Sequence, residues 1–320
     1  MSGFYGPVYD QLTIAIFRKS FVKHNTIINI GSINVDHVYR VPYFVKPGET
    51  LSSKSYQRVL GGKGANQSVA LARAGESVKH IGVIGDDHTW IIEELKSSKI
   101  DTSSIEVGSV ATGHALIQVD DNAENCILLF AGANHELSMN SLSGKLTDVE
   151  KGSWVLFQNE MPNLDKMISL AKEKSARIAV NPAPFDGAAK EIDYDLVDLL
   201  IVNDLEAEEL AKTKCQGDLS KLAELCPVVI ITRGTQGAIC YSANETIEVP
   251  SFKVEAVDTT GAGDTFVGYV LSSIAQELPL KDAMLRASAA SALAVTKPGA
   301  SVAIPTSAEV KQFLETMSDL

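Results

Sequence analysis

Asp258-Thr259-Thr260-Gly261-Ala262-Gly263-Asp264-Thr265-Phe266 is the most informative segment of the chain. The apolar run at 266–274 predicts a buried helix, and residues 261–263 should form its first turn. The N–H groups of a first turn lack intrahelical partners and lie at the positive end of the helix dipole. Gly261, Ala262 and Gly263 would let an anion approach this backbone closely, and Asp264 could accept a proton beside it.

An anion site next to a base is the minimum needed to transfer a phosphoryl group to a hydroxyl. Glycines before a helix and an acid in its first turn are also common structural features, so the segment alone leaves both interpretations open. Two other phosphate loops are excluded by spacing. No Gly-Lys pair is followed by Ser or Thr, and Phe266 stands where a dinucleotide-binding fingerprint has its third small residue.

The composition predicts a globular protein of the cytoplasm with a large core. The chain has 320 residues, 45% hydrophobic side chains and a formal charge of −12, which argues against nucleic acid and anionic membranes as partners. Its four cysteines form no CxxC pair and are typical of reduced core thiols. No run of about 18 apolar residues is present to span a membrane. Residues 1–25 are expected to be a poorly ordered extension, followed by one domain over 26–320.

Buried strands alternate with helices along this domain. Apolar, β-branched runs predict strands at 26–33, 78–84, 154–158, 177–180, 199–202 and 228–232. Helical periods lie at 65–74, 88–97, 164–173, 205–212, 263–276, 280–295 and 308–317. This alternation predicts an α/β fold with a mainly parallel central sheet covered by helices on both faces.

Two segments break the rhythm. Residues 35–60 and 112–130 contain strand patterns with little helix between them, and their side chains alternate between apolar and polar. Strands with one wet face do not belong in a doubly covered sheet. We expect a small second sheet that projects from the domain as a lid.

Gly61-Gly62-Lys63-Gly64-Ala65-Asn66-Gln67 ends a strand and opens a helix. Its glycines would let a substrate touch the main chain, while Lys63 and Asn66 offer donors to hydroxyl groups. An ordinary strand-to-helix turn is the structural alternative.

Acidic and amide residues also follow other predicted strands. Asn34 and Asp36 lie two positions apart, so both point to one side of an extended chain, where Asp36 could bind sugar hydroxyls. An Asx turn is equally compatible with them. Glu160 follows the strand at 154–158 and could face either a ligand or solvent.

Two further segments are compatible with nucleotide binding. Asn203 and Glu206 have the spacing of a helix capping box, or could reach phosphate oxygens and the hydration shell of Mg²⁺. Thr232-Arg233-Gly234-Thr235-Gln236-Gly237 links two strands and by itself indicates a tight turn.

In this order, the two glycine-rich blocks resemble the signatures of the ribokinase family of carbohydrate kinases, which is of the phosphofructokinase-B type. Each block is weak alone, but the two together are specific, and the resemblance covers nearly all of the chain from Thr26 onward. Four connecting segments add to it: Gly31-Ser32-Ile33-Asn34, Pro47-Gly48-Glu49-Thr50, Ala131-Gly132-Ala133-Asn134 and Asn181-Pro182-Ala183-Pro184.

The resemblance implies ATP-dependent phosphorylation of the 5-hydroxyl of D-ribose. It makes Asp264 the catalytic base and assigns the anion hole to the backbone of Gly261, Ala262 and Gly263. The matching sugar contacts are Asn34, Asp36, Gly62, Lys63, Gly64, Asn66, Glu160 and Asp264. The matching ATP contacts are Asn203, Thr232, Arg233, Gly234, Gly237, Gly263 and Ser288.

The resemblance also implies two cations and a homodimer formed through the lid sheets. Mg²⁺ would accompany ATP, with Glu206 acting through water. The matching K⁺ ligands are Asp258, Thr260, Ala294, Lys297, Gly299 and Ala303. Two positions depart from the family pattern, because Ala303 lacks the hydroxyl usual there and Ser288 replaces a larger polar residue. A kinase for deoxyribose, a ketohexose or a nucleoside, and a non-catalytic sugar-binding regulator, are the alternatives.

Overall fold

The main sheet is a mainly parallel one. The computed structural model describes residues 25–318 apart from 123, 148 and 244, so the predicted extension lies outside the described residues except for its last residue. Within them, the main sheet contains β1 (Ile27–Ile30), β4 (Val78–Gly85), β5 (Asp101–Gly108), β8 (Trp154–Gln158), β9 (Arg177–Asn181), β10 (Leu199–Asn203), β11 (Val228–Thr232), β12 (Ala238–Ser242) and β13 (Thr246–Val249).

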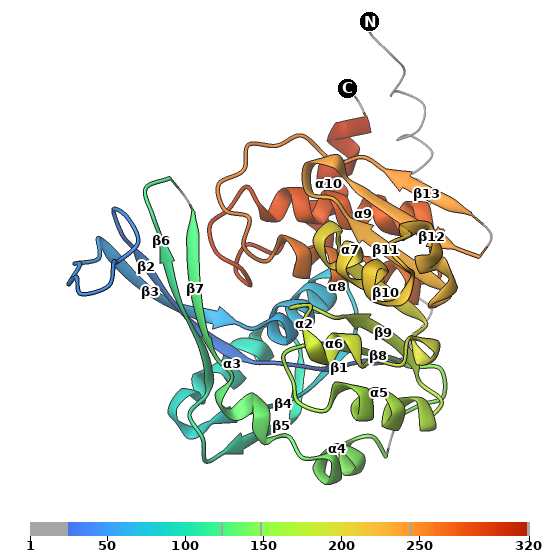
Figure 1. Ribbon diagram of the computed structural model, residues 1–320, viewed down its shortest axis with the longest axis horizontal. Coiled ribbons are helices and arrows are strands. Elements are labelled where there is room, and N and C mark those ends of the chain that lie inside the picture. The colour runs from blue at the N-terminus through green and yellow to red at the C-terminus, as the bar shows by residue number, and fades with distance from the viewer. Residues whose placement is uncertain (1–24, 123, 148, 244, 319–320) are drawn as a thin grey trace, which may run out of the picture.

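These strands lie in the order β13-β12-β11-β10-β9-β8-β1-β4-β5 (Figure 1). Neighbouring strands from β5 to β11 pair in parallel, whereas β12 and β13 add an antiparallel edge. The predicted parallel sheet is therefore confirmed.

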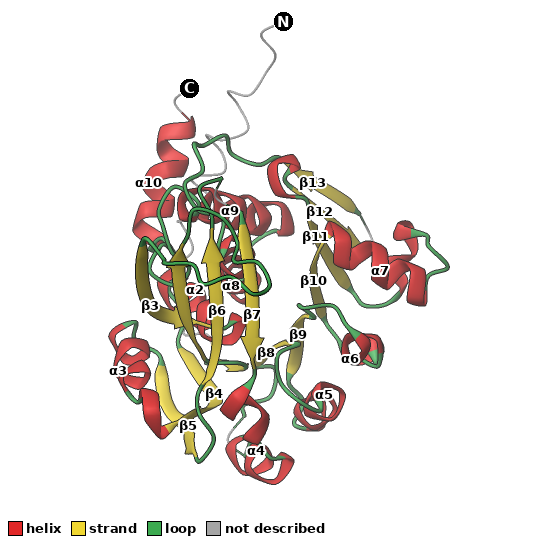
Figure 2. Cartoon of the chain, turned by 60° about the vertical axis from the view of Figure 1, so that its left-hand side comes forward, coloured by secondary structure: helices red, strands yellow, loops and turns green. Residues whose placement is uncertain are grey.

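Helices cover both faces of this sheet. They are α2 (Lys63–Ala74), α3 (Trp90–Ser97), α4 (Met139–Lys145), α5 (Leu164–Glu173), α6 (Gly187–Lys190), α7 (Asp204–Lys214), α8 (Ala262–Ala275), α9 (Leu280–Ala294) and α10 (Ser307–Ser318). Helices α2, α3, α8, α9 and α10 share one apolar core with the sheet, and α4 to α7 share another on the opposite face (Figure 2). No helix of the described residues combines the length and the apolar character that a membrane span requires.

The two cores explain why the strands read as continuous apolar runs. In β1, Ile27 packs into the core of α2 and α8, while Ile28 and Ile30 pack into the core of α5. A strand with helices on both faces buries successive side chains in opposite directions and therefore shows no polar alternation.

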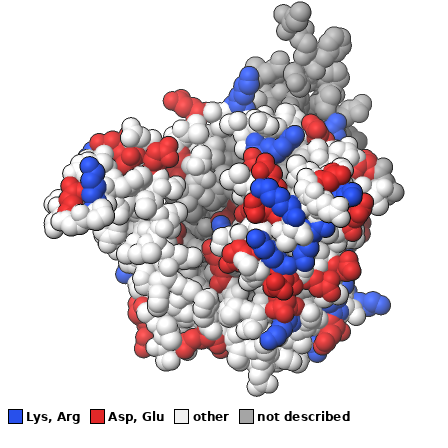
Figure 3. Space-filling model, viewed as in Figure 1, with Lys and Arg blue, Asp and Glu red and all other residues white. Residues whose placement is uncertain are grey.

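A second sheet projects from the main body, as the alternating segments predicted (Figure 1). It consists of β2 (Asn34–Arg40), β3 (Ser55–Gly61), β6 (Gly113–Val119) and β7 (Asn125–Phe130), in the order β3-β2-β6-β7. Strands β2 and β6 pair in parallel, and the outer pairs are antiparallel. The surface is hollowed between this sheet and the main body (Figure 3).

Helices α2 and α8 cross at very short range, and this contact positions the site described below. A Cβ added to Gly268 of α8 would lie 2.4 Å from Cβ of Ala70 and 2.9 Å from the backbone nitrogen of Leu71 in α2. Only glycine fits there. The close crossing brings the first turns of the two helices together, although they are about 200 positions apart in the sequence.

Some predicted boundaries differ from the structure. Strand β1 ends at Ile30 rather than at residue 33, because the chain then leaves the main sheet and joins β2 at Asn34. Helix α3 begins at Trp90, after a 3₁₀ turn at Asp86–His88. Strand β5 was not predicted because this half-exposed edge strand is rich in small polar residues. Strand β13, a short and largely exposed edge strand, was also not predicted.

Candidate active site

The first turn of α8 is open to a ligand. Gly261 is its N-cap residue at φ 75°, and no side chain caps the turn. Within the turn, the N–H of Ala262 points back to the carbonyl of Thr259 at 3.3 Å, and Thr265 bonds the carbonyl of Gly261. The amides of Gly263 and Asp264 thus have no side-chain partner at the N-terminus, and can meet an anion.

Asp264 is held by two amide donors from α2. Its Oδ2 accepts from Nδ2 of Asn66 at 3.0 Å, and its Oδ1 accepts from Nε2 of Gln67 at 2.9 Å. The carboxyl group is 9% exposed and lines a cavity of about 150 Å³, which we call the turn cavity. The two glycine-rich blocks of the sequence therefore meet at one carboxylate.

The turn cavity collects residues predicted for both substrates. Its lining includes Lys63 from the sugar block, Gly261, Gly263 and Asp264 from α8, and Asn203, Glu206 and Thr232 from the nucleotide segments. Asn181, the last residue of β9, and Ala183, which follows the strand, lie there as well. The carboxyl ends of β9, β10 and β11 meet at this edge of the sheet, where open α/β sheets bind ligands.

Asn203 and Glu206 form the capping box of α7. The N–H of Glu206 donates to Oδ1 of Asn203 at 2.8 Å, and the N–H of Asn203 donates to Oε2 of Glu206 at 2.9 Å. Burial raises the pKa of Glu206. Each side chain still has one polar atom outside the box, so the capping role that the sequence indicated does not use up the ligand-binding capacity of the pair.

Four residues predicted for ATP do not line the turn cavity. Arg233 forms an ion pair with Glu248 at 3.4 Å, and Gly234 and Gly237 shape the neighbouring turn at positive φ. Ser288 is buried in α9. Their contacts with a nucleotide stay predictions.

Asp36 lies on the inner face of the second sheet. It lines a larger cavity, of about 530 Å³, between this sheet and the loops 256–260 and 298–302, which we call the sheet cavity. A Cβ on Gly61 would lie 2.1 Å from the Asp36 carboxylate, so the first glycine of the sugar block makes room for that acid. Asn34 shares the strand, but its Oδ1 already accepts from Nδ2 of Asn134 at 2.7 Å.

Glu160 faces inward rather than toward solvent. Its Oε2 accepts a short hydrogen bond from the Ser32 hydroxyl and another from the backbone N–H of Lys63 at 3.1 Å. The residue that the sequence left undecided is thus fixed at the start of α2. Gly62 at φ 86° is the N-cap residue of this helix, and Gly64 packs against the backbone of Ser32.

The charges of Asp36, Glu160 and Asp264 all act on Lys63. The pKa of Asp36 is raised to about 7, first by burial and then by the charges of Glu160 and Asp264, with Lys63 opposing them. Burial also raises the pKa of Glu160. Burial alone would lower the pKa of Lys63, but Asp264, Glu160, Glu206 and Asp36 together raise it. Like charges held this close favour a ligand that brings hydroxyl donors to them.

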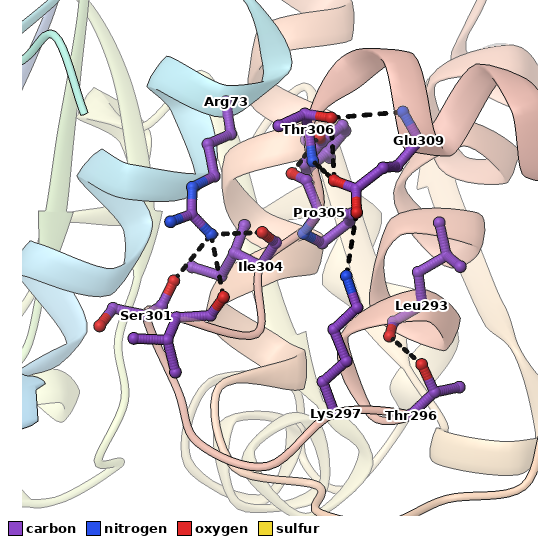
Figure 4. A network of polar contacts seen from close by, with 11 residues as sticks. Arg73, Leu293, Thr296, Lys297, Ser301, Ile304, Pro305, Thr306 and Glu309 are labelled. Atoms are coloured by element: carbon purple, nitrogen blue, oxygen red, sulfur yellow. Dashed lines mark hydrogen bonds and ion pairs between the residues drawn. The ribbon is translucent and has the colours of Figure 1, made fainter. Parts of the chain in front are cut away.

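Two of the residues predicted for K⁺, Thr260 and Gly299, are hydrogen-bonded to a third, Asp258. Its Oδ1 accepts from the N–H of Thr260 and its Oδ2 from the N–H of Gly299, each at 2.9 Å. The loop that carries Gly299 and Ala303 is fixed by Arg73 of α2, whose Nη1 donates to the carbonyls of Ser301, Val302 and Ile304 (Figure 4). Lys297 is paired with Glu309 at 2.9 Å.

Apart from the Asp258 carboxylate and the Thr260 hydroxyl, the residues predicted for K⁺ carry oxygen only in their backbone carbonyls. The described residues contain no group of three or more His, Cys, Asp or Glu side chains arranged to hold a metal ion. Carbonyl oxygens with one carboxylate suit a large monovalent cation better than a transition metal.

Sequence reasoning missed several supporting residues. Gln67 donates hydrogen bonds to Asp264 and to Asn181. Ser32 donates to Glu160, and Asn134 donates to Asn34. The four missed residues, Gln67, Asn181, Ser32 and Asn134, lie in segments already recognised as family-like. Their polar character next to glycine or at a strand end was the available signal, but their partners lie far away in the sequence.

The chain resembles known carbohydrate kinases over most of its length. Residues 25–307 match the family described as pfkB family carbohydrate kinase. The ribokinase of Haemophilus influenzae is 38% identical over 306 residues, covering 91% of this chain and 98% of that protein. The ribokinase of Cryptococcus neoformans var. grubii, solved with ADP, has a TM-score of 0.79 at 32% identity and covers 90% of this chain and 99% of that one. The ribokinase of Arabidopsis thaliana, solved with ribose and ATP, has a TM-score of 0.79 at 25% identity, with 91% and 99% covered.

Replacing Asp36 by Asn should change how stability depends on pH. The raised pKa means that the folded state holds the Asp36 proton up to about pH 7, whereas the unfolded chain releases it near the ordinary aspartate pKa of 3.8. The contribution of this proton to the free energy of unfolding is fully present below pH 3.8 and is lost as the pH rises from there to about 7. Each pKa unit corresponds to about 1.4 kcal/mol, so Asp36→Asn should be more stable than wild type by a few kcal/mol at pH 8 and by less at pH 5.

Urea unfolding of the ligand-free proteins at both pH values measures this difference. Asp165→Asn, an exposed aspartate in the first turn of α5, is the matched control and should track wild type. An Asp36→Asn advantage that is equal at pH 5 and pH 8 would contradict the buried, protonated carboxyl.

Proposed function

We propose a ribokinase activity for this chain, which belongs to the pfkB family of carbohydrate kinases: D-ribose and ATP are converted to D-ribose 5-phosphate and ADP. As a family member it is a phosphotransferase that acts on a sugar hydroxyl. The proposal of ribose rests on the ribokinase relatives, whose identity with this chain extends over nearly its whole length.

One observation supports the chemistry most strongly. The carboxylate of Asp264 and the uncapped amides of the α8 turn line the same cavity, next to the carboxyl ends of three parallel strands. A proton acceptor and an anion site at hydrogen-bonding range from one small volume are what phosphoryl transfer to an alcohol needs.

The proposed mechanism follows from charge. Asp36, Lys63 and Glu160 orient the sugar, with Asp36 and Glu160 accepting from its hydroxyls. Asp264 takes the proton of the 5-hydroxyl as that oxygen attacks the terminal phosphorus of ATP, and ADP leaves. The amides of Gly263 and Asp264 neutralise the charge on the transferred phosphoryl group. Each well-aimed donor contributes roughly 10²–10³ in rate, and the base about 10²–10⁴.

Two cations are part of the proposal. Mg²⁺ would bind with ATP and neutralise its phosphates, and Glu206, at the rim of the turn cavity, would orient its water ligands. K⁺ would bind the carbonyl-rich loop around Asp258, where Ala303 supplies no hydroxyl. That loop packs directly on Gly261, where an added Cβ would lie 3.1 Å from Cα of Ala300. The conformation of the loop therefore affects the shape of the first turn of α8.

A substrate panel tests the assignment. ADP release should be fastest with D-ribose and slower with deoxyribose, a ketohexose and a nucleoside, and it should rise when tetramethylammonium is replaced by K⁺. A higher kcat/KM for another acceptor would replace ribose as the substrate. Tight ribose binding without ADP release would instead indicate the non-catalytic regulator.

Asp264→Asn should lower kcat by about 10²–10⁴, because the amide cannot accept a proton. Ribose should still bind, since Asp36, Lys63 and Glu160 remain. Calorimetry gives the ribose affinity and coupled ADP release gives kcat, with Asp165→Asn again as the control. Near-normal turnover by Asp264→Asn would refute the assigned base.

We also propose that two copies associate through the second sheet. Strand β7 forms its edge and exposes Ile127, Leu128, Leu129 and Phe130 in succession, with Leu128 67% exposed. An edge strand with four apolar residues in a row is a surface that proteins normally cover. A second copy of the same sheet is the partner that the family resemblance implies.

Leu128→Glu should convert the dimer into a monomer, because it places a charge at the centre of this surface. Light scattering coupled to gel filtration should give twice the 34.3 kDa chain mass for wild type and the single mass for the variant. Leu205→Glu, an exposed leucine on α7 outside the second sheet, should stay dimeric. A monomeric wild type, or a dimeric Leu128→Glu, would rule out this interface.

A further inference from the structure

A continuous chain of buried side chains leads from Asp264 into the main sheet. Gln67 donates to Asp264 and accepts at its Oε1 from Nε2 of Gln158 in β8, at 2.7 Å. The same Nε2 donates to Oδ1 of Asn29 at 3.0 Å, and Asn29 donates to the Ser68 hydroxyl at 2.8 Å. Ser68 contacts Nδ1 of His80 at 2.8 Å.

The two outer residues of this network, His80 and Asn181, each face a backbone carbonyl, which can only accept a hydrogen bond. Nε2 of His80 faces the carbonyl of Gly31 at 3.2 Å and must carry the proton. Burial lowers the pKa of His80 to about 4, so its Nδ1 is an acceptor and Ser68 donates to it. A second branch is equally fixed, because Asn181 donates to the carbonyl of Ile201 and must present Oδ1 to Nε2 of Gln67 at 2.9 Å.

These hydrogen-bond directions allow only one orientation of the side-chain amide of Gln67. Its oxygen is opposed by the Gln158 donor and its nitrogen by the Asn181 oxygen, so the N–H side always faces Asp264. This orientation carries a cost, because Oε1 of Gln158 is buried without a hydrogen-bond partner among the described residues. A buried unpaired acceptor in the core calls for a functional reason.

We infer that Gln67 is a positioning residue for Asp264, and that Gln158 acts on Asp264 through Gln67. The inference rests on the proposed kinase function. The chain is not a proton wire, since carboxamide groups hold their protons. Its effect is to hold the carboxylate in one rotamer with an N–H donor on Oδ1, which favours the ionised form required of a base.

Gln67→Met removes the donor with little change in volume. It should lower kcat by about 10- to 100-fold through misplacement of the base, with the KM for ribose little changed. The acidic limb of the kcat profile should move to higher pH, because the carboxylate loses a hydrogen-bond donor. The other charged groups that couple to Asp264 are Lys63, Asp36, Glu160 and Glu206, and all are retained.

Gln158→Met, which does not touch the site, should shift kcat and the acidic limb in the same direction by a smaller amount. The double variant should behave like Gln67→Met alone, because Gln158 acts through Gln67. Gln276→Met is the matched control, since this glutamine lies at the far end of α8 and bonds Glu76. It should change stability without moving the pH profile.

The outcomes are distinguishable. Absence of ribose phosphorylation by wild type refutes the proposed function itself. With wild-type turnover present, an unmoved acidic limb in Gln67→Met, or losses that multiply in the double variant, overturn the inference. If Gln158→Met does not fold, Gln67→Met alone still decides by its pH profile. A crystal structure of Gln67→Met showing Asp264 in its original rotamer would also overturn it.

Discussion

The hydrogen bonds from Asn66 and Gln67 to Asp264 are the constraint on which the site depends. They require the first turns of α2 and α8 to approach closely, and Gly268 permits this by packing on the backbone of α2. They also connect the two glycine-rich blocks. Each block opens a helix whose first turn lines the turn cavity, and the Asp264 carboxylate joins the two blocks.

The site is built at the expense of stability. Three buried acids around Lys63 repel one another, and the Asp36 carboxyl is held so far from water that it keeps its proton to about pH 7. A polyhydroxylated ligand would supply hydroxyl donors to Asp36, so binding and folding favour opposite protonation states of this carboxyl group. Gly61 leaves room for the Asp36 carboxylate, whereas Gly62 and Gly64 let the start of α2 pack against the backbone of Ser32.

The sequence predicted well what depends on local pattern. The limits of β8, β11 and α5 agree with the structure, and the second sheet was recognised from its polar alternation. Asn203 and Glu206 form the capping box that their spacing indicated. The pairing of Gln67 with Gln158, and of Asn34 with Asn134, could not be predicted, because the partners are about 90 and 100 residues apart and amides carry no periodic signal. The roles of Ser288 and Arg233 stay predictions for a related reason, since neither lines a cavity without its nucleotide.

The most direct test of the account is a crystal structure with D-ribose and a non-hydrolysable ATP analogue. The account predicts the 5-hydroxyl oxygen within about 2.6–3.2 Å of a carboxylate oxygen of Asp264. It also predicts the terminal phosphate on the amides of Gly263 and Asp264, with Asn66 and Gln67 still bonded to the carboxylate. A 5-hydroxyl directed to another side chain, or a phosphate bound away from the α8 turn, would contradict it.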